Sequence, residues 1–273
     1  MDWRRDLFAQ YASDRSTGGI PGYRVERLED LTRHEPKSGD EALLSFARFA
    51  SGAADRRIRE ELERLRMRGW EAEWKVHDFD EPPDLKSRLE AQRLAADHAE
   101  ALMVLDANDS CAAVPMAPEV TVEMAAGAQL DELARLQEEV WRIRLPWLAC
   151  ALREMTDPVH GSGVAFCARI GGRIVASGWI DFPPGSRFAQ LCGGAVLEPF
   201  RGRGVYSHLF ARRVAEARAR GVPWIAVDAA PMSRPILERK GFRFVCSTYP
   251  MRTRPFETTA VTQGFFNHER AQA

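Results

Sequence analysis

The sequence has no apolar stretch long enough to cross a membrane and no cluster of cysteines spaced to hold a metal ion. Its five cysteines are scattered, which favours reduced thiols in the cytoplasm over a disulfide framework. The 38 basic residues nearly balance the 39 acidic ones, so no overall field attracts nucleic acid or a membrane surface. The first residues lack the pattern of a signal peptide. We therefore expect a cytoplasmic protein without metal, nucleic-acid or membrane partners.

What is present is ordinary for a globular chain, with 45% apolar and 28% charged residues. A length of 273 residues favours two domains, each large enough to bury a core of its own. Length and composition therefore indicate a globular protein of two domains. Its function has to be predicted from local motifs.

The most informative segment lies between residues 194 and 207. An apolar run at 195–197 stops at Glu198-Pro199, and a glycine-rich turn at 201–204 leads into residues with helical apolar spacing. The first turn of a helix carries unpaired N–H groups and the positive end of the helix dipole. Glycines let a ligand approach that backbone closely, and two arginines add positive charge. The segment therefore predicts a phosphate or pyrophosphate site.

Two well-known phosphate motifs do not fit this turn. The phosphate loop of nucleotide hydrolases requires Lys-Ser/Thr after its last glycine, whereas Val205-Tyr206 follow here. The dinucleotide fingerprint requires a third glycine, at a position that holds Ser207. Nucleotide hydrolysis and dinucleotide binding are therefore disfavoured.

The turn instead resembles the Arg/Gln-x-x-Gly-x-Gly/Ala signature of the GNAT family of N-acetyltransferases. Residues 201–205 match this signature, and Tyr206 departs from it because a small residue is usual there. The resemblance implies that the turn holds the pyrophosphate of acetyl-CoA and that backbone groups of the preceding strand hold the pantetheine arm. The expected coenzyme A contacts are Ala195, Val196, Leu197, Arg201, Gly202, Arg203, Gly204, Val205, Tyr206 and Ser233.

Periodicity around the turn predicts an order of strands and helices, and the resemblance implies that they form an α+β domain with a mixed, mostly antiparallel sheet flanked by helices. The resemblance covers about residues 118–254. The doubled glycine Gly193-Gly194 suggests a bulge or a close backbone approach, where this fold would admit the thioester. The expected helices are 128–143, 146–155, 205–220 and 233–240, and the expected strands are 164–170, 173–182, 188–197, 223–228 and 242–246.

The N-terminal half repeats this order of elements in weaker form. A helix at 58–69, a strand at 70–79, a helix at 84–94 and a strand at 101–106 predict a degenerate duplication of the same fold. The position of its phosphate turn, 50–55, has one glycine and an acid, Asp55, which suits a helix cap better than a phosphate. We expect domains at 1–110, without a coenzyme A loop, and at 118–273, joined by a linker around 107–118.

The proton-transfer residues are less well specified. The pair Gly241-Phe242 resembles a Gly-Phe step that is usual in the family. In the family, a tyrosine shortly before this step and a glutamate before the phosphate turn often serve as acid and base. The matching positions hold Leu237 and Gln190, which cannot exchange a proton. Asp181 is the best remaining carboxylate and is the expected base or amine contact, although an acid before Pro183-Pro184 is also normal turn chemistry. The other titratable candidates are Tyr206, Tyr249, His160 and His208.

The resemblance implies an enzyme that moves an acetyl group from acetyl-CoA to an amine of a small molecule or peptide. A tandem transferase similar to mycothiol synthase is an alternative. A non-catalytic sensor of acyl-CoA, or a partner-binding module, is another, because both usual proton-transfer residues are missing.

Overall fold

The structure, a computed structural model, describes residues 3–17, 20–37, 39–109 and 117–253. The C-terminal half begins with a short strand and two helices, followed by three long strands and alternating helices and strands. Its elements are β7 (Thr121–Met124), α4 (Gln129–Trp141), α5 (Leu148–Met155), β8 (Gly163–Ile170), β9 (Arg173–Asp181), β10 (Phe188–Val196), a 3-10 turn (Glu198–Phe200), α6 (Val205–Ala219), β11 (Trp224–Ala229), α7 (Arg234–Arg239) and β12 (Arg243–Arg252).

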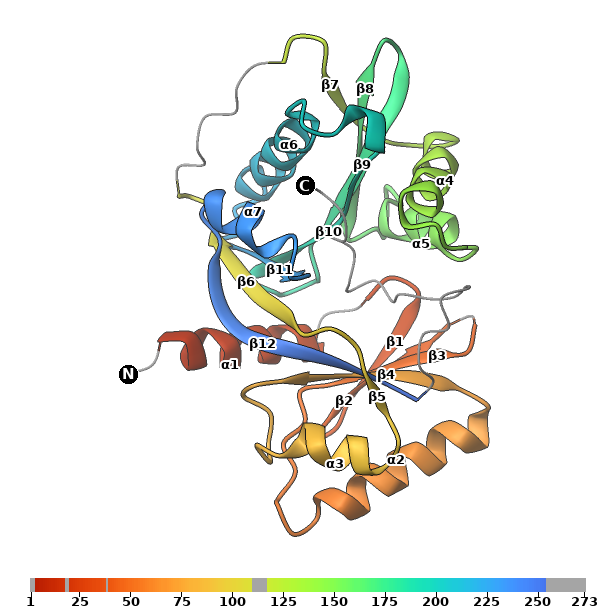
Figure 1. The fold of residues 1–273 in the computed structure, drawn as a ribbon, viewed down its shortest axis with the longest axis vertical. Helices are drawn as coiled ribbons and strands as arrows, with labels where there is room; N and C mark the ends of the chain where they lie inside the picture. Colours follow the sequence, from red (N-terminus) through yellow and green to blue (C-terminus); the bar gives the residue numbers. More distant parts are fainter. Residues whose placement is uncertain (1–2, 18–19, 38, 110–116, 254–273) are drawn as a thin grey trace.

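The N-terminal half opens with a helix that lies between the two halves in Figure 1. Its elements are α1 (Trp3–Thr17), β1 (Tyr23–Arg27), β2 (Thr32–Pro36), β3 (Glu41–Ser45), α2 (Ala54–Arg68), β4 (Glu71–His77), α3 (Leu85–Ala91), β5 (Ala95–Ala96) and β6 (Glu100–Asp106). Helix α2 buries Ile58 and Leu65 on one face. It ends at Gly69, whose left-handed backbone (φ 67°) lets its N–H bond the Arg66 carbonyl.

The described strands form one sheet of twelve that runs through both halves (Figure 1). The order is β1-β2-β3-β4-β12-β6-β11-β10-β9-β8-β7, with β5 beside β12. The last strand of each half is exchanged: β6 lies between β11 and β12, while β12 lies between β4 and β6. An ion pair of 3.0 Å between Lys75 on β4 and Asp228 on β11 also crosses this junction. The halves therefore share strands and do not form two separate sheets.

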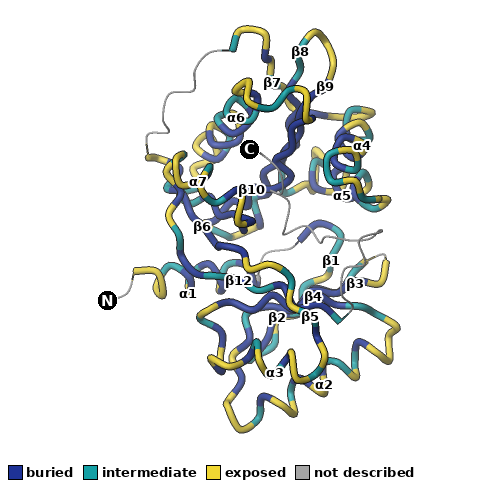
Figure 2. Tube along the Cα trace, viewed as in Figure 1, coloured by how far each residue is buried: buried dark blue, intermediate teal, exposed yellow. Residues whose placement is uncertain are grey.

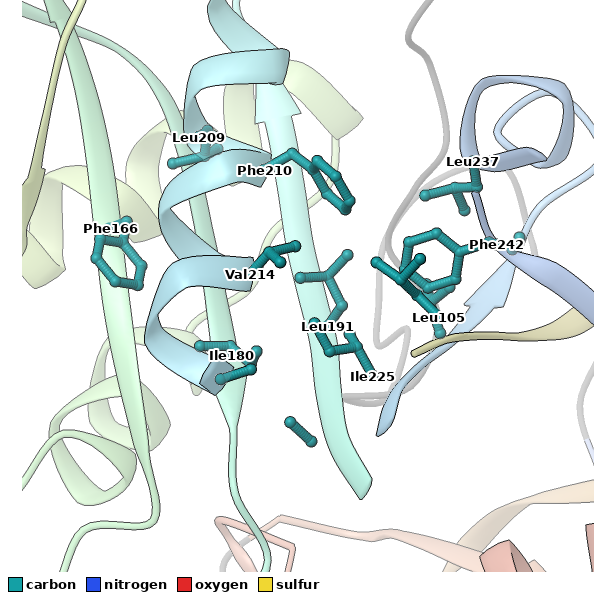
Figure 3. Close-up of a cluster of buried hydrophobic side chains, with 14 of the residues drawn as sticks. Leu105, Phe166, Ile180, Leu191, Leu209, Phe210, Val214, Ile225, Leu237 and Phe242 are labelled. Atoms are coloured by element: carbon teal, nitrogen blue, oxygen red, sulfur yellow. The ribbon is translucent and has the colours of Figure 1, made fainter. Parts of the chain in front are cut away.

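Helices cover both faces of the C-terminal sheet. Helix α6 packs Leu209, Phe210 and Val214 onto strands β8 to β10 (Figure 3). Helices α4 and α5 cover the opposite face, and α1 packs beside the β10–β11 junction through Phe8 and Tyr11. Figure 2 shows buried strands and outward helix faces that are exposed. Alternate side chains of each strand point to opposite faces of the sheet. One set therefore packs against α6 and the other against α4 and α5.

Most of the elements expected in 128–246 are present with ends shifted by a few residues. Helix α1 and strands β1 to β3 were not predicted. Helix α1 buries a narrow stripe, Phe8, Tyr11 and Ala12, among many charged neighbours, so its apolar period is weak. The expected cap at Asp55 was wrong: α2 begins after Ala53 without a side-chain cap, and the Asp55 carboxylate lies 2.8 Å from Arg88. The division at 1–110 and 118–273 stays a prediction.

Candidate functional site

Strands β10 and β11 run parallel but remain paired only at their first three residues. The register joins Phe188, Ala189 and Gln190 to Trp224, Ile225 and Ala226. Beyond Gln190, β10 continues to Val196 with β9 as its neighbour, and β11 continues to Ala229 with β6. The carboxyl ends of the two central strands therefore separate, which is where a ligand enters an open sheet of this kind.

The open edge of β10 carries the residues expected to hold the pantetheine arm. Ala195, Val196 and Leu197 are buried, and the first two pair with β9. The Leu197 N–H donates to the Val175 carbonyl of β9 at 2.9 Å. Neighbouring residues of a strand direct their backbone groups to opposite edges, so the Val196 groups face away from β9. The Val196 carbonyl accepts from Arg201 Nε at 3.1 Å, which joins this edge to the turn.

The glycine-rich turn has the geometry that its sequence predicts. Gly202 (φ 72°) and Gly204 (φ 75°) both adopt the left-handed backbone that favours glycine. A Cβ atom on either would meet no atom within 4 Å, so the space above the turn is open. Helix α6 starts at Val205, directly after Gly204, and its first N–H groups have no acceptor within the helix. An anion placed above the turn would meet these N–H groups and the positive end of the dipole.

The two arginines of the turn have different surroundings. Arg201 is half-buried and bonded to Val196, whereas Arg203 is exposed and lies 3.4 Å from the Glu119 carboxylate. An exposed ion pair of this kind contributes little, so the Arg203 guanidinium can leave Glu119 for a phosphate. The turn thus carries one half-buried and one exposed cation.

Tyr206 stands at the position where the family usually has a small residue. Its half-buried ring stacks on Phe210, with centroids 6.5 Å apart, and the Lys240 ammonium lies 5.7 Å from its centroid. Lys240 also donates to the Ser207 hydroxyl at 2.9 Å, which joins the start of α6 to the end of α7. Ser233 is buried directly before α7, on the loop that follows β11. Tyr206 therefore lies at the start of α6, which follows β10, and Ser233 lies at the start of α7, which follows β11.

Asp181 is the last residue of β9 and is buried, not an exposed turn residue. It pairs in register with Gln190, so both side chains lie on the face opposite α6. Burial raises the pKa of the Asp181 carboxyl from 3.8 to about 6, and the Ser162 hydroxyl, which donates to it, opposes this shift. The carboxylate is thus mostly ionised at neutral pH, with a pKa suited to accepting a proton.

Helix α1 brings Tyr11, which was not among the expected site residues, to the same face. Its hydroxyl donates to Gln190 Oε1 at 3.3 Å, and its ring packs edge-on against Phe188. Burial raises the pKa of Tyr11, so it remains a neutral donor. Among the described residues, Gln190 Nε2 has no hydrogen-bond partner. No local signal marks Tyr11, because only the packing of α1 brings it to β10.

The remaining candidates lie away from this point. Leu237 is fully buried and points into the core beside Phe242 (Figure 3). Tyr249 lies on β12 opposite Val76 of β4, in the N-terminal part of the sheet. His160 is exposed in a loop, and His208 Nε2 accepts from the Ala117 N–H at 3.2 Å. In the described part of the chain, no group of His, Cys, Asp and Glu side chains is arranged to hold a metal ion.

The corresponding place in the N-terminal half is closed. Strands β3 and β4 stay paired over five residues, from Glu41 with Glu71 to Ser45 with Lys75. Beyond β3, the Phe49 N–H donates to the Glu81 carbonyl at 2.9 Å, and the Glu81 N–H donates to the Ala47 carbonyl at 3.0 Å. These bonds connect the two chain segments where β10 and β11 separate in the other half. No comparable opening exists between these described segments.

Comparisons with known proteins concern the family and the fold. Residues 130–242 match the family model of the acetyltransferase (GNAT) family. A GCN5-related N-acetyltransferase from Kribbella flavida is 13% identical, with a TM-score of 0.69 over 92% of this chain and 96% of that one. A tandem GNAT protein from the clavulanic acid biosynthesis pathway is 14% identical, with a TM-score of 0.60 over 94% and 95%.

At these identities the structural matches show the fold alone, and the family model assigns residues 130–242 to the GNAT family. The chain has no significant match among curated protein sequences. Residues 130–242 therefore form a domain of the GNAT acetyltransferase family, and the chain as a whole shares its fold with GCN5-related N-acetyltransferases, a tandem GNAT protein among them. No described helix is long and apolar enough to pass through a membrane.

Proposed function

We propose that the protein is an N-acyltransferase that binds acetyl-CoA between β10 and β11 and transfers the acetyl group to an amine in the cytoplasm. The observation that carries this proposal is the separation of these strands after Gln190, directly below an open glycine turn at the start of α6. The turn supplies N–H groups for the pyrophosphate, and the edge of β10 at Val196 supplies backbone groups for the pantetheine arm.

The chemistry requires a neutral amine at the thioester carbon. The amine nitrogen forms a bond to that carbon while the C=O electron pair moves to oxygen, and the pair returns as the C–S bond breaks. The amine loses a proton and the leaving thiolate gains one. We assign the first transfer to Asp181, whose carboxylate is buried on the face opposite α6. Tyr11, held against Gln190, is a neutral hydroxyl available on the same face.

We propose one coenzyme A site per chain, in the C-terminal half. The N-terminal strands stay paired through Ser45 and Lys75, and Glu81 closes the space beyond them. The acceptor is an amine of a small molecule or peptide that approaches the face carrying Asp181 and Gln190, next to helix α1.

A second candidate function is the sensing of acyl-CoA without turnover. It is favoured by Leu237, which lies in the core at the position where the family often has a tyrosine acid. A tandem transferase similar to mycothiol synthase is a variant of the main proposal with a different acceptor. The transferase and the sensor would use the same coenzyme A site and differ in whether acyl transfer occurs.

The test combines titration calorimetry with acetyl-CoA and detection of free thiol in the presence of a panel of amines. Saturable binding at one site with amine-dependent thiol release supports the transferase. Binding without release from any amine supports the sensor. A protein that does not bind acetyl-CoA contradicts both functions.

A further inference from the structure

Strand β10 has a bulge just beyond the point where it leaves β11. Its pairing with β9 joins Cys192 to Trp179 and Ala195 to Ser177. Two residues of β10, Gly193 and Gly194, therefore stand opposite one residue of β9. A bulge bends its strand and redirects local backbone groups, and bulges occur often beside active sites. This one lies along the proposed path of the acyl-pantetheine arm.

From the face of α6, Arg213 bonds to the backbone of this bulge. Its Nη1 donates to the Cys192 carbonyl at 3.2 Å, and its side chain is fully buried. Gly178, opposite the bulge, makes room for it: a Cβ there would lie 3.0 Å from Arg213 Nη1. Arg213 Nη2 has no hydrogen-bond partner, and no carboxylate of the described residues forms an ion pair with this guanidinium.

From the opposite face, Gln137 of α4 bonds to the same bulge. Its Nε2 donates to the Gly193 carbonyl at 2.6 Å and to the Ser177 hydroxyl at 2.7 Å. Its Oε1 accepts from Trp141 Nε1 at 2.7 Å, which determines the orientation of the amide. Gly193 is required here, because a Cβ would come within 1.9 Å of Trp179.

A buried cation without an anionic partner is costly, and an apolar side chain of similar size would serve packing better. The cation does, however, have an electrostatic effect on the bulge. The Cys192 carbonyl and the Gly193 N–H belong to one peptide unit, so a charged donor on the carbonyl polarises the unit. The Gly193 N–H thereby becomes a stronger hydrogen-bond donor.

We propose that Arg213, together with Gln137, is a positioning residue that fixes the bulge and strengthens the Gly193 N–H as a donor to the thioester oxygen. This inference rests on the proposed function, because it places the acyl group of acyl-CoA at the bulge. When the amine adds to the thioester carbon, negative charge develops on that oxygen and the polarised N–H stabilises it. The charge returns to neutral as the C–S bond breaks.

The kinetic test compares Arg213→Met with Arg213→Lys and with the control Arg212→Met, which removes the same charge from the exposed neighbouring position. For Arg213→Met we expect kcat to fall about 10- to 100-fold, less than is typical for deleting an oxyanion donor outright. The KM for acetyl-CoA should change by less than about threefold, because the pyrophosphate contacts remain. Arg213→Lys should recover part of kcat, and Arg212→Met should behave as the wild type.

A second measurement does not depend on finding the acceptor. Infrared spectra of bound acetyl-CoA labelled with ¹³C at the thioester carbonyl report the hydrogen bond to its oxygen. The wild type and Arg212→Met should show a shift to lower frequency relative to free acetyl-CoA, and folded Arg213→Met should lose most of it. An equal shift in Arg213→Met, or an unchanged kcat, overturns the inference while leaving the proposed function intact. A wild type that does not bind acetyl-CoA overturns both.

Discussion

The two halves of the sheet contain the same order of elements around a pair of parallel strands, yet only one pair separates. In the C-terminal half, β10 and β11 part after Gln190, and an open glycine turn begins α6. In the N-terminal half, β3 and β4 stay paired, and Glu81 bonds to the segment that follows β3. The comparison shows that this fold does not by itself open a gap between its parallel strands.

The gap between β10 and β11 depends on backbone groups of these strands that no neighbouring strand pairs with. Separating two central strands exposes N–H and C=O groups, which is unfavourable unless a ligand or a side chain satisfies them. Arg201 does so in part through the Val196 carbonyl, and β10 has a bulge between Cys192 and Ala195. The N-terminal half satisfies the equivalent groups internally, through the bonds that join Glu81 to Ala47 and Phe49.

The largest effect is expected for Gly204→Glu, which places a carboxylate in the open space above the turn. Acetyl-CoA affinity should fall more than about 100-fold, since charge repulsion and a filled phosphate site act together. Titration calorimetry measures it. Gly52→Glu, in the corresponding N-terminal turn, should leave affinity and a stoichiometry of one unchanged, because that half has no opening between its described parallel strands.

The matched control for backbone strain is Gly221→Glu, at the other end of α6. Gly221 has a similar left-handed backbone (φ 68°) and equally open surroundings. The Gly221→Glu variant should lose stability as Gly204→Glu does but retain acetyl-CoA binding. If Gly52→Glu also weakened binding, or the wild type bound two coenzymes, the N-terminal half would not be degenerate.

The next effect concerns Asp181→Asn, which tests whether the face opposite α6 carries the base. We expect kcat at neutral pH to fall about 100-fold, in the usual range for loss of a general base. The wild-type rate should rise with pH through an apparent pKa of about 6, and the variant should lack that step. A full rate between pH 6 and 9 in the variant would make Asp181 a structural acid.

The same residue gives a prediction about stability. The pKa of Asp181 is about 6 in the folded protein, against an ordinary value of 3.8, so the native state holds this proton more tightly than the unfolded chain does. This tighter proton binding stabilises the folded protein fully below pH 3.8. The stabilisation is lost as pH rises through 6, a change of about 3 kcal/mol in the free energy of unfolding. Asp181→Asn should therefore raise the free energy of unfolding relative to wild type more at pH 7.5 than at pH 4. Urea unfolding at the two pH values measures this, and a pH-independent difference would contradict it.

The smallest effect is expected for Tyr11→Phe, which removes only the hydroxyl that α1 brings to Gln190. The loss of one buried hydrogen bond should cost about 1 kcal/mol of stability. If the acceptor binds this face, its KM should rise several-fold while acetyl-CoA affinity stays constant. Steady-state kinetics with the best amine checks this. A change in acetyl-CoA affinity alone would place Tyr11 on the donor side instead.

Local sequence determined the glycine-rich turn, its helix and most of the C-terminal elements. Glycines at 202 and 204, an apolar strand before them and a helical period after them are short-range signals that do not depend on distant residues. The same reasoning indicated that residues 50–55 are poorly suited to a pyrophosphate. The resemblance to the GNAT family rested on this local pattern, and the family model covering 130–242 confirms it.

Only the tertiary structure decided which side chains meet at the strand separation. Tyr11 and Gln190 are 179 residues apart in the chain, and the strand exchange of β6 and β12 pairs segments from opposite halves. The burial of Asp181 and that of the Arg213 cation are likewise invisible to local periodicity. Burial and charge pairing depend on contacts between distant segments, so local sequence specified the glycine-rich turn, and the fold determined the environment of Asp181 and Arg213.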